Sequence, residues 1–393
     1  MKKNKKKIAI VHPRLIVGGG SESCAMWAAQ ILKESYEVSL ITMGEVNLSG
    51  LNEFYGTNIK EGEVAIITIP LPFFLKKKFD ALRTIALARY AKKNALQFDV
   101  MISTYNVMDF GKKGIQFLAD FSFDDHLRRT FNAEPGKSQG WWYKKSFARM
   151  LYLALAQMLS GTVQENWKKN ITLANSYWTQ HIFKKHYGIT PPVVYPPVVG
   201  MFAKVPWDKR EDGFVYVGRI SPEKQIEKII HMIAAVRKKN SKIHLHIIGG
   251  DDDSVYAQKI KKLCQENNQW CFLEGQMQGP AKLEFIGKHK YGISARSHEP
   301  FGIAVAEMVK SGCIVFVPDG GGQVEIVGNK KLIYESDADA VRKIEQVILS
   351  RSLQKPIQKQ LLKNSVRFSI EMFTKELQHY IKKLLSENKD HGN

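Results

Sequence analysis

The chain alternates short runs of β-branched residues with longer helical patterns, in two blocks separated by a proline-rich segment. Alternation of this kind indicates βαβ units, in which helices connect the strands of a parallel sheet. The runs expected to form strands are 7–13, 38–42, 64–70, 99–104, 114–120 and 171–176 in the first block, and 214–220, 243–250, 270–276, 291–296, 314–319 and 331–336 in the second. The sequence therefore predicts an α/β fold with a parallel sheet in each block.

The proline-rich segment divides the chain into two parts. Proline fixes φ and lacks a backbone donor, so this segment cannot be a helix or a central strand. Because 393 residues are many for a single core, we expect two domains. The expected parts are an N-terminal domain over 1–190, an interdomain connection over 191–207, a C-terminal domain over 208–370, and a final helix within 371–393 that crosses back to the first domain.

The formal net charge of +20 indicates an anionic partner, which is a nucleic acid, a membrane surface or a phosphate-bearing substrate. The sequence has no RNP1 motif, KH loop or paired zinc ligands, so we expect no nucleic-acid partner. No apolar run reaches the roughly 18 residues that span a bilayer, and we expect no signal peptide. The four cysteines lack C-x-x-C spacing, which argues against zinc and fits reduced thiols in a cytoplasm.

Two cations lie where the first strand of the second block ends. Arg219 follows that strand directly, and Lys224 comes five residues later at the start of a helix. In open α/β sheets, ligands bind outside the carboxyl ends of the strands, and a helix N-terminus there favours phosphate. Together the two cations would neutralise a diphosphate. The alternative is that both are solvated surface residues.

Two glutamates follow a later strand of the same block. Glu299 lies in a loop, because Pro300 biases it away from helical geometry, whereas Glu307 lies on a helix that begins near Ile303. Both carboxylates could accept hydrogen bonds, from the hydroxyls of a sugar and of a ribose respectively. Gly302 would let backbone amides approach a ligand closely. Glu307 is flanked by apolar residues and needs a partner, although a capping or surface role is the alternative.

These segments resemble motifs of the family-four retaining glycosyltransferases, which have the GT-B fold of two Rossmann-like domains with a donor cleft between them. HEPFGIAVAE (298–307) is similar to the family's E-x7-E motif, and VGRISPEK (217–224) to its Arg…Lys diphosphate motif. Further similar segments, in the family's order, are GGGSE (18–22), ANSYWT (174–179), VVYPPV (193–198) and GGGQVEIV (320–327). The resemblance leans towards relatives that extend lipid-linked oligosaccharides, such as the α-1,2-mannosyltransferase of dolichol-linked glycans.

The resemblance implies a retaining hexosyltransferase that uses a GDP- or UDP-linked sugar and needs neither a cofactor nor a metal. Arg219 and Lys224 would bind the donor diphosphate, Glu299 the sugar hydroxyls, and Glu307 the ribose. The remaining donor contacts implied are Gly19 and Gly20 from the first domain, Phe301, Gly302 and Ile303 beside the sugar phosphate, and Gly275 and Gln276 beside the base. The leaving diphosphate, stabilised by positive charge, could itself take the proton of the incoming hydroxyl.

One departure from the family concerns the end of the run 114–120. Many relatives carry a histidine there, whereas the nearest polar residue here is Asp120. Asp120 could position the acceptor hydroxyl or the donor sugar. It could equally be a helix cap or a loop residue, since both are common uses of aspartate.

Several other polar residues are candidates for a site but have simpler explanations. The acidic run 251–253 resembles the metal-binding motif of the other glycosyltransferase fold, yet it follows a strand and precedes a helix, so capping explains it. His12, His181 and His298 are isolated, which is typical of structural histidines, and only His298 adjoins an expected site residue.

Two other functions fit the same fold. A nucleotide-sugar epimerase would convert the sugar nucleotide without an acceptor, and an inactive module would bind it without turnover. The presence of Arg219, Lys224, Glu299 and Glu307 together favours a transferase over both alternatives.

Basic and aromatic stretches in the first domain predict contact with an anionic membrane. They lie at 71–79, 128–129 and 141–159. Aromatic rings at the headgroup level with cations beside them suit an interfacial helix. The alternative is that 146–159 is a core helix with a solvated basic face. We expect a peripheral protein on the cytoplasmic face of a membrane, with a glycan or lipid-linked acceptor bound to the first domain.

Overall fold

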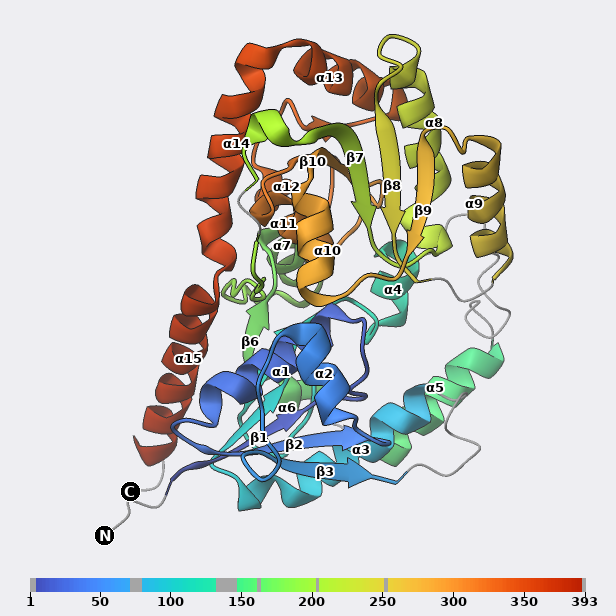
Figure 1. Ribbon diagram of the computed structural model, residues 1–393. Coiled ribbons are helices and arrows are strands. Elements are labelled where there is room, and N and C mark those ends of the chain that lie inside the picture. The colour runs from blue at the N-terminus through green and yellow to red at the C-terminus, as the bar shows by residue number, and fades with distance from the viewer. Residues whose placement is uncertain are drawn as a thin grey trace.

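The computed structural model describes residues 5–70, 80–131, 147–160, 164–202, 205–250 and 254–390. Two α/β domains lie one above the other, and helices cover the sheet of each (Figure 1). Each sheet has six strands, and all strand pairings within it are parallel. The prediction of an α/β fold with two parallel sheets is confirmed.

The first sheet has the strand order β3-β2-β1-β4-β5-β6. Its strands are β1 (Lys7–Val11), β2 (Glu37–Met43), β3 (Ala65–Ile69), β4 (Val100–Ser103), β5 (Ile115–Leu118) and β6 (Ile171–Ala174). The helical segments of this domain are α1 (Gly20–Leu32), α2 (Leu48–Tyr55), α3 (Asp80–Asn94), η2 (Ala95–Gln97), α4 (Asp125–Phe131), α5 (Phe147–Ser160), α6 (Gln164–Lys168) and α7 (Tyr177–Tyr187). Successive strand residues point to opposite faces, so Ile8 and Ile10 pack with α1, and Ala9 and Val11 pack with α3.

The second sheet has the strand order β12-β11-β10-β7-β8-β9. Its strands are β7 (Glu211–Val217), β8 (His244–Ile248), β9 (Cys271–Gly275), β10 (His289–Ile293), β11 (Ile314–Pro318) and β12 (Ile333–Tyr334). The helical segments are η4 (Trp207–Lys209), η5 (Pro222–Lys224), α8 (Ile226–Arg237), α9 (Val255–Glu266), α10 (Gly279–Gly287), α11 (Ile303–Lys310), α12 (Gln323–Val327), α13 (Asp337–Leu349), α14 (Arg351–Ser365) and η6 (Val366–Phe368). This domain has a buried core of its own.

Every run expected to form a strand overlaps one, although the bounds differ by up to three residues, as for the run 214–220 and β7. The run 291–296 forms β10, which begins at His289 and stops at Ile293, and only Ile333–Tyr334 of the run 331–336 form β12. The residues after Ile293 leave the sheet and lead into the loop that carries Glu299. The shorter strand therefore makes room for the candidate site.

The chain passes between the domains twice, and the two connections are joined. Within the segment 191–207, Val193 forms an isolated parallel bridge with Ala174 at the open edge of the first sheet. Further along, the amide of Val198 donates to the carbonyl of Phe368, 2.9 Å away, just before the chain returns. One hydrogen bond thus ties the outgoing connection to the returning one.

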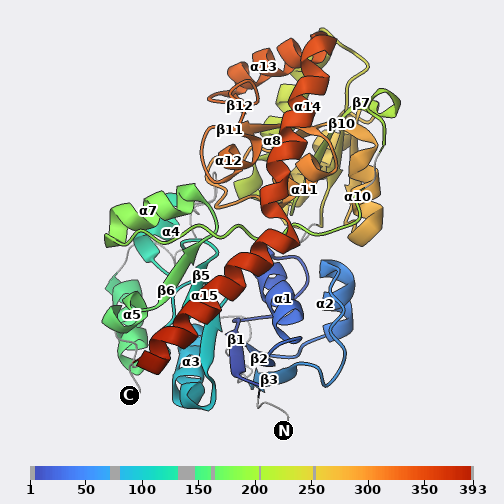
Figure 2. The same ribbon diagram turned by 90° about the vertical axis from the view of Figure 1, so that its left-hand side faces the viewer.

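The returning segment is α15 (Ile370–Asp390), which lies along the first domain (Figure 2). Phe373, Leu377, Ile381 and Leu384 lie on one side of this helix and are at most 2 % exposed. They pack in the same apolar cluster as α1 and β1. Among the described residues, no helix combines the length and the apolar character that crossing a bilayer requires.

Candidate active site

The strand β7 points towards the first domain (Figure 1), and two charged side chains of the second domain meet beyond strand ends. Lys224 ends η5, shortly after β7, and Glu299 lies in the loop after β10. Lys224 Nζ and Glu299 Oε2 are 2.6 Å apart, and both side chains are mostly buried. A second cation, Arg296 Nη1, lies 3.4 Å from the same oxygen. Two residues singled out by the sequence therefore form one ion pair.

The charges around Glu299 fix its protonation state. Burial alone would raise the pKa of Glu299, but the charges of Lys224 and Arg296 and the hydrogen bond from Lys224 lower it to about 2. The carboxylate is therefore ionised at physiological pH and can only accept hydrogen bonds. Such a group suits the hydroxyls of a sugar, with a cation beside it for a phosphate.

Arg219 lies at the same end of the sheet but is held more loosely. Its side chain is 73 % exposed, and its guanidinium is 3.4 Å from Glu223. A surface pair of this kind contributes little to stability, so the side chain can turn towards an incoming anion. Arg219 and Lys224 thus place one exposed and one mostly buried cation near Glu299.

Three successive glycines hold the Glu299 loop in place. Gly320 and Gly321 have φ values of 134° and 72°, which L side chains rarely adopt. A Cβ atom on Gly321 would overlap the carbonyl oxygen of Glu299, and one on Gly322 would overlap that of Pro300. The amide of Gly322 donates to the Glu299 carbonyl at 2.8 Å. The glycines of the segment 320–327 therefore shape the loop that presents the carboxylate.

The glycine loop of the first domain reaches the same place. A Cβ atom on Gly20 would lie 2.8 Å from Cδ1 of Ile303, so the starts of α1 and α11 touch across the two domains. The hydroxyl of Tyr55 fixes the loop, because the amides of Gly18 and Gly19 both donate to it at 3.1 Å. The structure thus brings Gly19, Gly20 and Ile303 together, as the sequence predicts for a shared site.

Glu22 also belongs to this region, although the sequence pointed to it only as part of the GGGSE segment. Its carboxylate lies over Gly19, where a Cβ atom would overlap it, and accepts a hydrogen bond from the Ser21 hydroxyl at 2.8 Å. Burial raises the pKa of Glu22, the charge of Arg219 lowers it, and that of Asp120 raises it. Charged groups of both domains therefore act on one another here.

Asp120 is anchored in the first domain by its neighbours. Its Oδ1 accepts from the amide nitrogen of the Asn106 side chain at 2.8 Å and from the backbone of Ser122 at 2.9 Å. Asn106 has a positive φ of 65° and in turn accepts from the backbone of Asp120. These contacts of Asp120 fit the role of a loop residue, which the sequence left open beside a role in substrate binding.

The other expected donor residues have defined surroundings. Glu307 on α11 pairs through both oxygens with Lys282 Nζ, at 2.8 and 2.9 Å, so its partner is a lysine that the sequence did not reveal.

The Phe301 ring is 3 % exposed and packs against aromatic rings, which leaves its backbone to line the site. Gly275, with φ of 72°, is the last residue of β9, and Gln276 follows it at the same end of the sheet. Gly302 caps α11 with φ of 105°.

Side chains from three segments that resemble family motifs, 174–179, 193–198 and 320–327, hold the domains together. The Ser176 hydroxyl donates to the carbonyl of Pro300 at 2.6 Å. Glu325 on α12 accepts from the amide of Trp178 at 2.8 Å and from the Tyr195 hydroxyl at 2.9 Å. The segments 174–179, 193–198 and 320–327 therefore meet at one junction next to the Glu299 loop, where the sequence alone gave them no individual roles.

The remaining candidates lie away from the ion pair or have structural surroundings. His12 is buried at the end of β1, and burial lowers its pKa to about 3. The ring of His298 stacks on Trp178 at 6.1 Å between centroids. Residues 251–253 lie outside the described residues.

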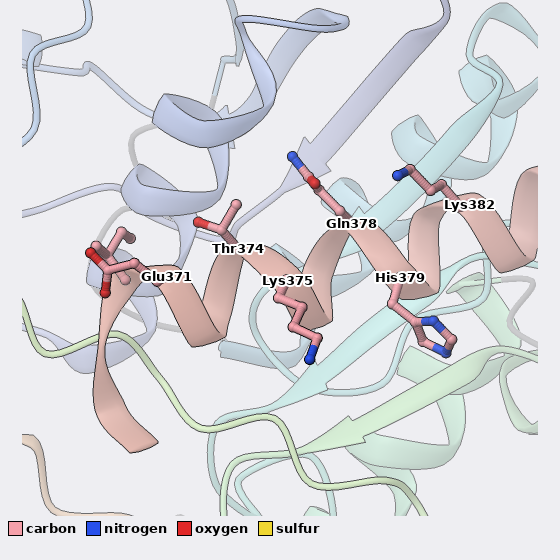
Figure 3. Close-up of a pocket in the computed structure, with 7 residues that line it drawn as sticks. Glu371, Thr374, Lys375, Gln378, His379 and Lys382 are labelled. Atoms are coloured by element: carbon pink, nitrogen blue, oxygen red, sulfur yellow. The ribbon is translucent and has the colours of Figure 1, made fainter. Parts of the chain in front are cut away.

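A groove of about 600 Å³ is lined by α15 residues, among them Lys375, His379 and Lys382, and contains none of the expected donor residues (Figure 3).

Comparison with known proteins supports one interpretation of this geometry. Residues 201–367 match the family model described as glycosyl transferases group 1. Over 95 % of this chain and 85 % of the relative, the sequence is 24 % identical to the human GDP-Man:Man(3)GlcNAc(2)-PP-Dol alpha-1,2-mannosyltransferase. It is also 24 % identical to the human alpha-1,3/1,6-mannosyltransferase ALG2, over 54 % of this chain and 58 % of that protein.

Solved structures show the same fold. WaaG, a glycosyltransferase involved in lipopolysaccharide biosynthesis, matches with a TM-score of 0.67 at 13 % identity, covering 94 % of this chain and 98 % of its own. Anabaena Alr3699/HepE in complex with UDP-glucose matches with a TM-score of 0.68 at 13 % identity, covering 96 % and 99 %. The two parallel sheets and the solved structures show the GT-B fold, and residues 201–367 match the group 1 glycosyl transferases. Together with the mannosyltransferase relatives, these matches show that the chain is a glycosyltransferase.

Proposed function

We propose that the protein transfers a hexose from a GDP- or UDP-sugar to a lipid-linked glycan, with retention of the anomeric configuration. The observation that carries this proposal is the Lys224–Glu299 pair beside the glycine loop of the first domain. It sets a cation for a diphosphate next to an ionised carboxylate for a sugar. The name of the human relative, which contains GDP-Man and PP-Dol, makes GDP-mannose and a polyprenyl-linked acceptor the first pair to test.

In the proposed reaction the acceptor hydroxyl attacks the anomeric carbon on the face from which the nucleoside diphosphate leaves. The bond from that carbon to the phosphate oxygen breaks, its electrons pass to the diphosphate, and the hydroxyl proton moves to a phosphate oxygen. Lys224 and Arg219 stabilise the charge that develops. Glu299 orients the sugar, Asp120 orients the acceptor hydroxyl, and neither is a nucleophile. The positive charges replace a divalent metal.

The proposal is tested with a panel of GDP- and UDP-hexoses, with and without a polyprenyl diphosphate oligosaccharide. Nucleotide release should require the acceptor and continue in excess EDTA, and NMR of the product should show the anomeric configuration of the donor. Conversion of the donor without an acceptor would instead identify an epimerase. Tight donor binding without turnover would identify a binding module, and a loss of turnover reversed by Mg²⁺ or Mn²⁺ would contradict metal-independence.

The helix α5 supports the proposed contact with a membrane. Phe147, Met150, Leu151, Leu155 and Met158 are each 47 % exposed or more and recur at helical spacing. An apolar face of this kind, presented to water, suits the interface of a bilayer. The segments 71–79 and 141–146 lie outside the described residues, and Arg128 and Arg129 both pair with Asp125. The proposed contact therefore depends on the apolar face of α5.

The cysteines support a cytoplasmic setting for this contact. Cys24, Cys264, Cys271 and Cys313 are all buried and unbridged, and the sulfur atoms of Cys264 and Cys271 lie 3.5 Å apart without a bond. Free thiols at such a distance persist where the surroundings are reducing. We therefore propose the cytoplasmic face of a membrane as the place of action.

A further inference from the structure

Three histidines and a glutamate converge at the starts of β7, β8 and β10. In Figure 1 the starts of β7 and β8 lie at the end of the second sheet that is remote from the first domain. Glu211, His244 and His289 are the first residues of β7, β8 and β10, and His246 lies two positions along β8, on the same face as His244. One ligand atom from each of the four residues lies within 4.8 Å of the others. The donor residues lie at the opposite ends of these strands.

The spacing of the cluster is close to that of a tetrahedral metal site. Glu211 Oε2 is 3.4 Å from His244 Nε2 and 3.8 Å from His289 Nε2. Around a zinc ion with bonds of about 2.0–2.1 Å, neighbouring ligand atoms are about 3.3 Å apart. The four ligand atoms, which are up to 4.8 Å apart, would move closer together around an ion, and the Glu211 side chain, which is 56 % exposed, has room to do so.

Hydrogen bonds outside the cluster orient two of the rings. His289 Nδ1 is 2.9 Å from the carbonyl oxygen of Phe285, and His246 Nδ1 is 2.7 Å from Glu274 Oε1. Because a carbonyl or carboxylate oxygen can only accept, each ring donates through Nδ1 and keeps the lone pair on Nε2. A carboxylate or carbonyl behind a histidine is the usual support of a metal-binding imidazole.

The cluster also contains buried nitrogen atoms that lack a partner. Nε2 of His244 and Nε2 of His289 accept no hydrogen bond from the described residues, although the His289 side chain is only 1 % exposed. Gly213 leaves room for the His244 ring, which a Cβ atom there would overlap. A buried lone pair without a partner is unfavourable, and a cation would satisfy it.

We propose that Glu211, His244, His246 and His289 bind one zinc ion. Imidazole nitrogen suits zinc over Mg²⁺ or Ca²⁺, which prefer oxygen ligands. Four protein ligands fill a tetrahedral ion, so the site is structural and leaves no position for a substrate. The ion would join β10, β7 and β8, which are adjacent in the sheet, at their starting residues. It is separate from the donor chemistry, which uses the other ends of the strands.

Zinc binding is measured on the full chain after chelation and dialysis, by metal analysis and by titration with ZnCl₂. We expect one zinc ion per chain that survives gel filtration. The double variant His244→Ala/His246→Ala should lose at least about 100-fold in zinc affinity, and Glu274→Gln about 10-fold, since it removes only an outer partner. His231→Ala, which changes an exposed histidine on α8, is the matched control and should bind as the parent does.

Two further measurements distinguish a specific zinc site from nonspecific binding of zinc at the surface. Co²⁺ in the site should give the strong visible absorption of a four-coordinate ion, and zinc should raise the Tm of the parent protein but not that of the double variant. Nucleotide binding should be unchanged in the double variant, which shows that it is folded. If the double variant is unfolded, Glu211→Gln and Glu274→Gln decide by the same readouts. Absence of a retained ion, or equal zinc affinity in the variants, would overturn the proposal.

Discussion

Lys224 and Glu299 neutralise each other before any donor is bound. Each charge offsets the cost of burying the other, and their contact fixes both groups in position. A donor therefore meets charges that are already oriented, and its diphosphate must share Lys224 with the carboxylate. Removing either partner would leave the other buried charge without its nearest counter-charge, so a substitution that keeps the shape is the better probe.

Glu299→Gln is expected to separate the sugar from the rest of the donor. The amide keeps the size of the side chain but loses the charge, and a charge-assisted hydrogen bond contributes about 1.5–3 kcal/mol. The Kd of the sugar nucleotide should therefore rise about 10- to 150-fold, while that of the free nucleoside diphosphate changes much less. Isothermal titration measures both, with Glu335→Gln at an exposed position as the control. Unchanged affinity for the sugar nucleotide would remove Glu299 from the donor site.

His12 makes the stability of the protein depend on pH. Burial lowers its pKa from 6.5 to about 3 in the folded state. Between pH 6.5 and pH 3 the unfolded chain therefore binds a proton at His12 that the folded chain does not bind. The contribution of His12 to the free energy of unfolding thus decreases as the pH falls through this window, and it is constant above pH 6.5. Between pH 7 and pH 5 the loss due to His12 is about 2 kcal/mol.

Urea denaturation at pH 7 and pH 5 tests this dependence. In His12→Gln the difference in the free energy of unfolding between the two pH values should shrink by about 2 kcal/mol. His379→Gln, which changes a histidine on α15, should leave the difference as it is in the parent. An unaltered pH dependence in His12→Gln would show that other groups cause it.

Some site residues could be assigned from the sequence and others could not, because their positions have different causes. Arg219, Lys224 and Glu299 follow strand ends, and topology alone brings strand ends to one edge. Lys282, by contrast, reaches Glu307 only because α10 packs beside α11, and Ser176 reaches Pro300 only because the two domains meet. Such contacts depend on packing between elements, which spacing along the chain does not encode.

At the scale of elements, the strands were predictable because both faces of each sheet are covered. A strand buried on both faces reads as a continuous apolar run, as in the first strand, Lys7–Val11. Strand ends were less predictable, since β10 begins at His289, where polar residues meet at the start of the sheet. The helix α5 was expected, but its exposed apolar face distinguishes it from the core helix considered as the alternative.

Charge introduced on the exposed face of α5 should weaken binding to vesicles. Leu151→Glu/Leu155→Glu replaces two half-exposed leucines, so the fold loses little while the apolar face is interrupted. Co-sedimentation with vesicles containing anionic lipid should fall several-fold for this variant and with rising salt. Leu349→Glu, at a 67 % exposed leucine of the second domain, is the control. If the double variant sediments like the parent, α5 is not the contact.

At the scale of the whole molecule, α15 belongs to the first domain although it follows the second in sequence. Leu377→Ala removes a fully buried side chain from the cluster that contains α1 and β1. Truncating a buried leucine costs about 2–5 kcal/mol. Calorimetry should show the transition of the first domain at a lower temperature, whereas that of the second, which has its own core, stays in place. Leu349→Ala is the exposed control, and equal shifts of both transitions would contradict separate cores.

The return of α15 has a consequence for how the protein is made. During synthesis the second domain can fold as soon as its last strand and helices leave the ribosome, because its core is built from one continuous stretch of chain. The first domain emerges earlier but must wait for α15 to cover its apolar face. At about 5–20 residues per second, translation of the intervening domain takes roughly 10–40 s. For that time the nascent first domain exposes the face that α15 later buries, which makes it a client for chaperones during synthesis.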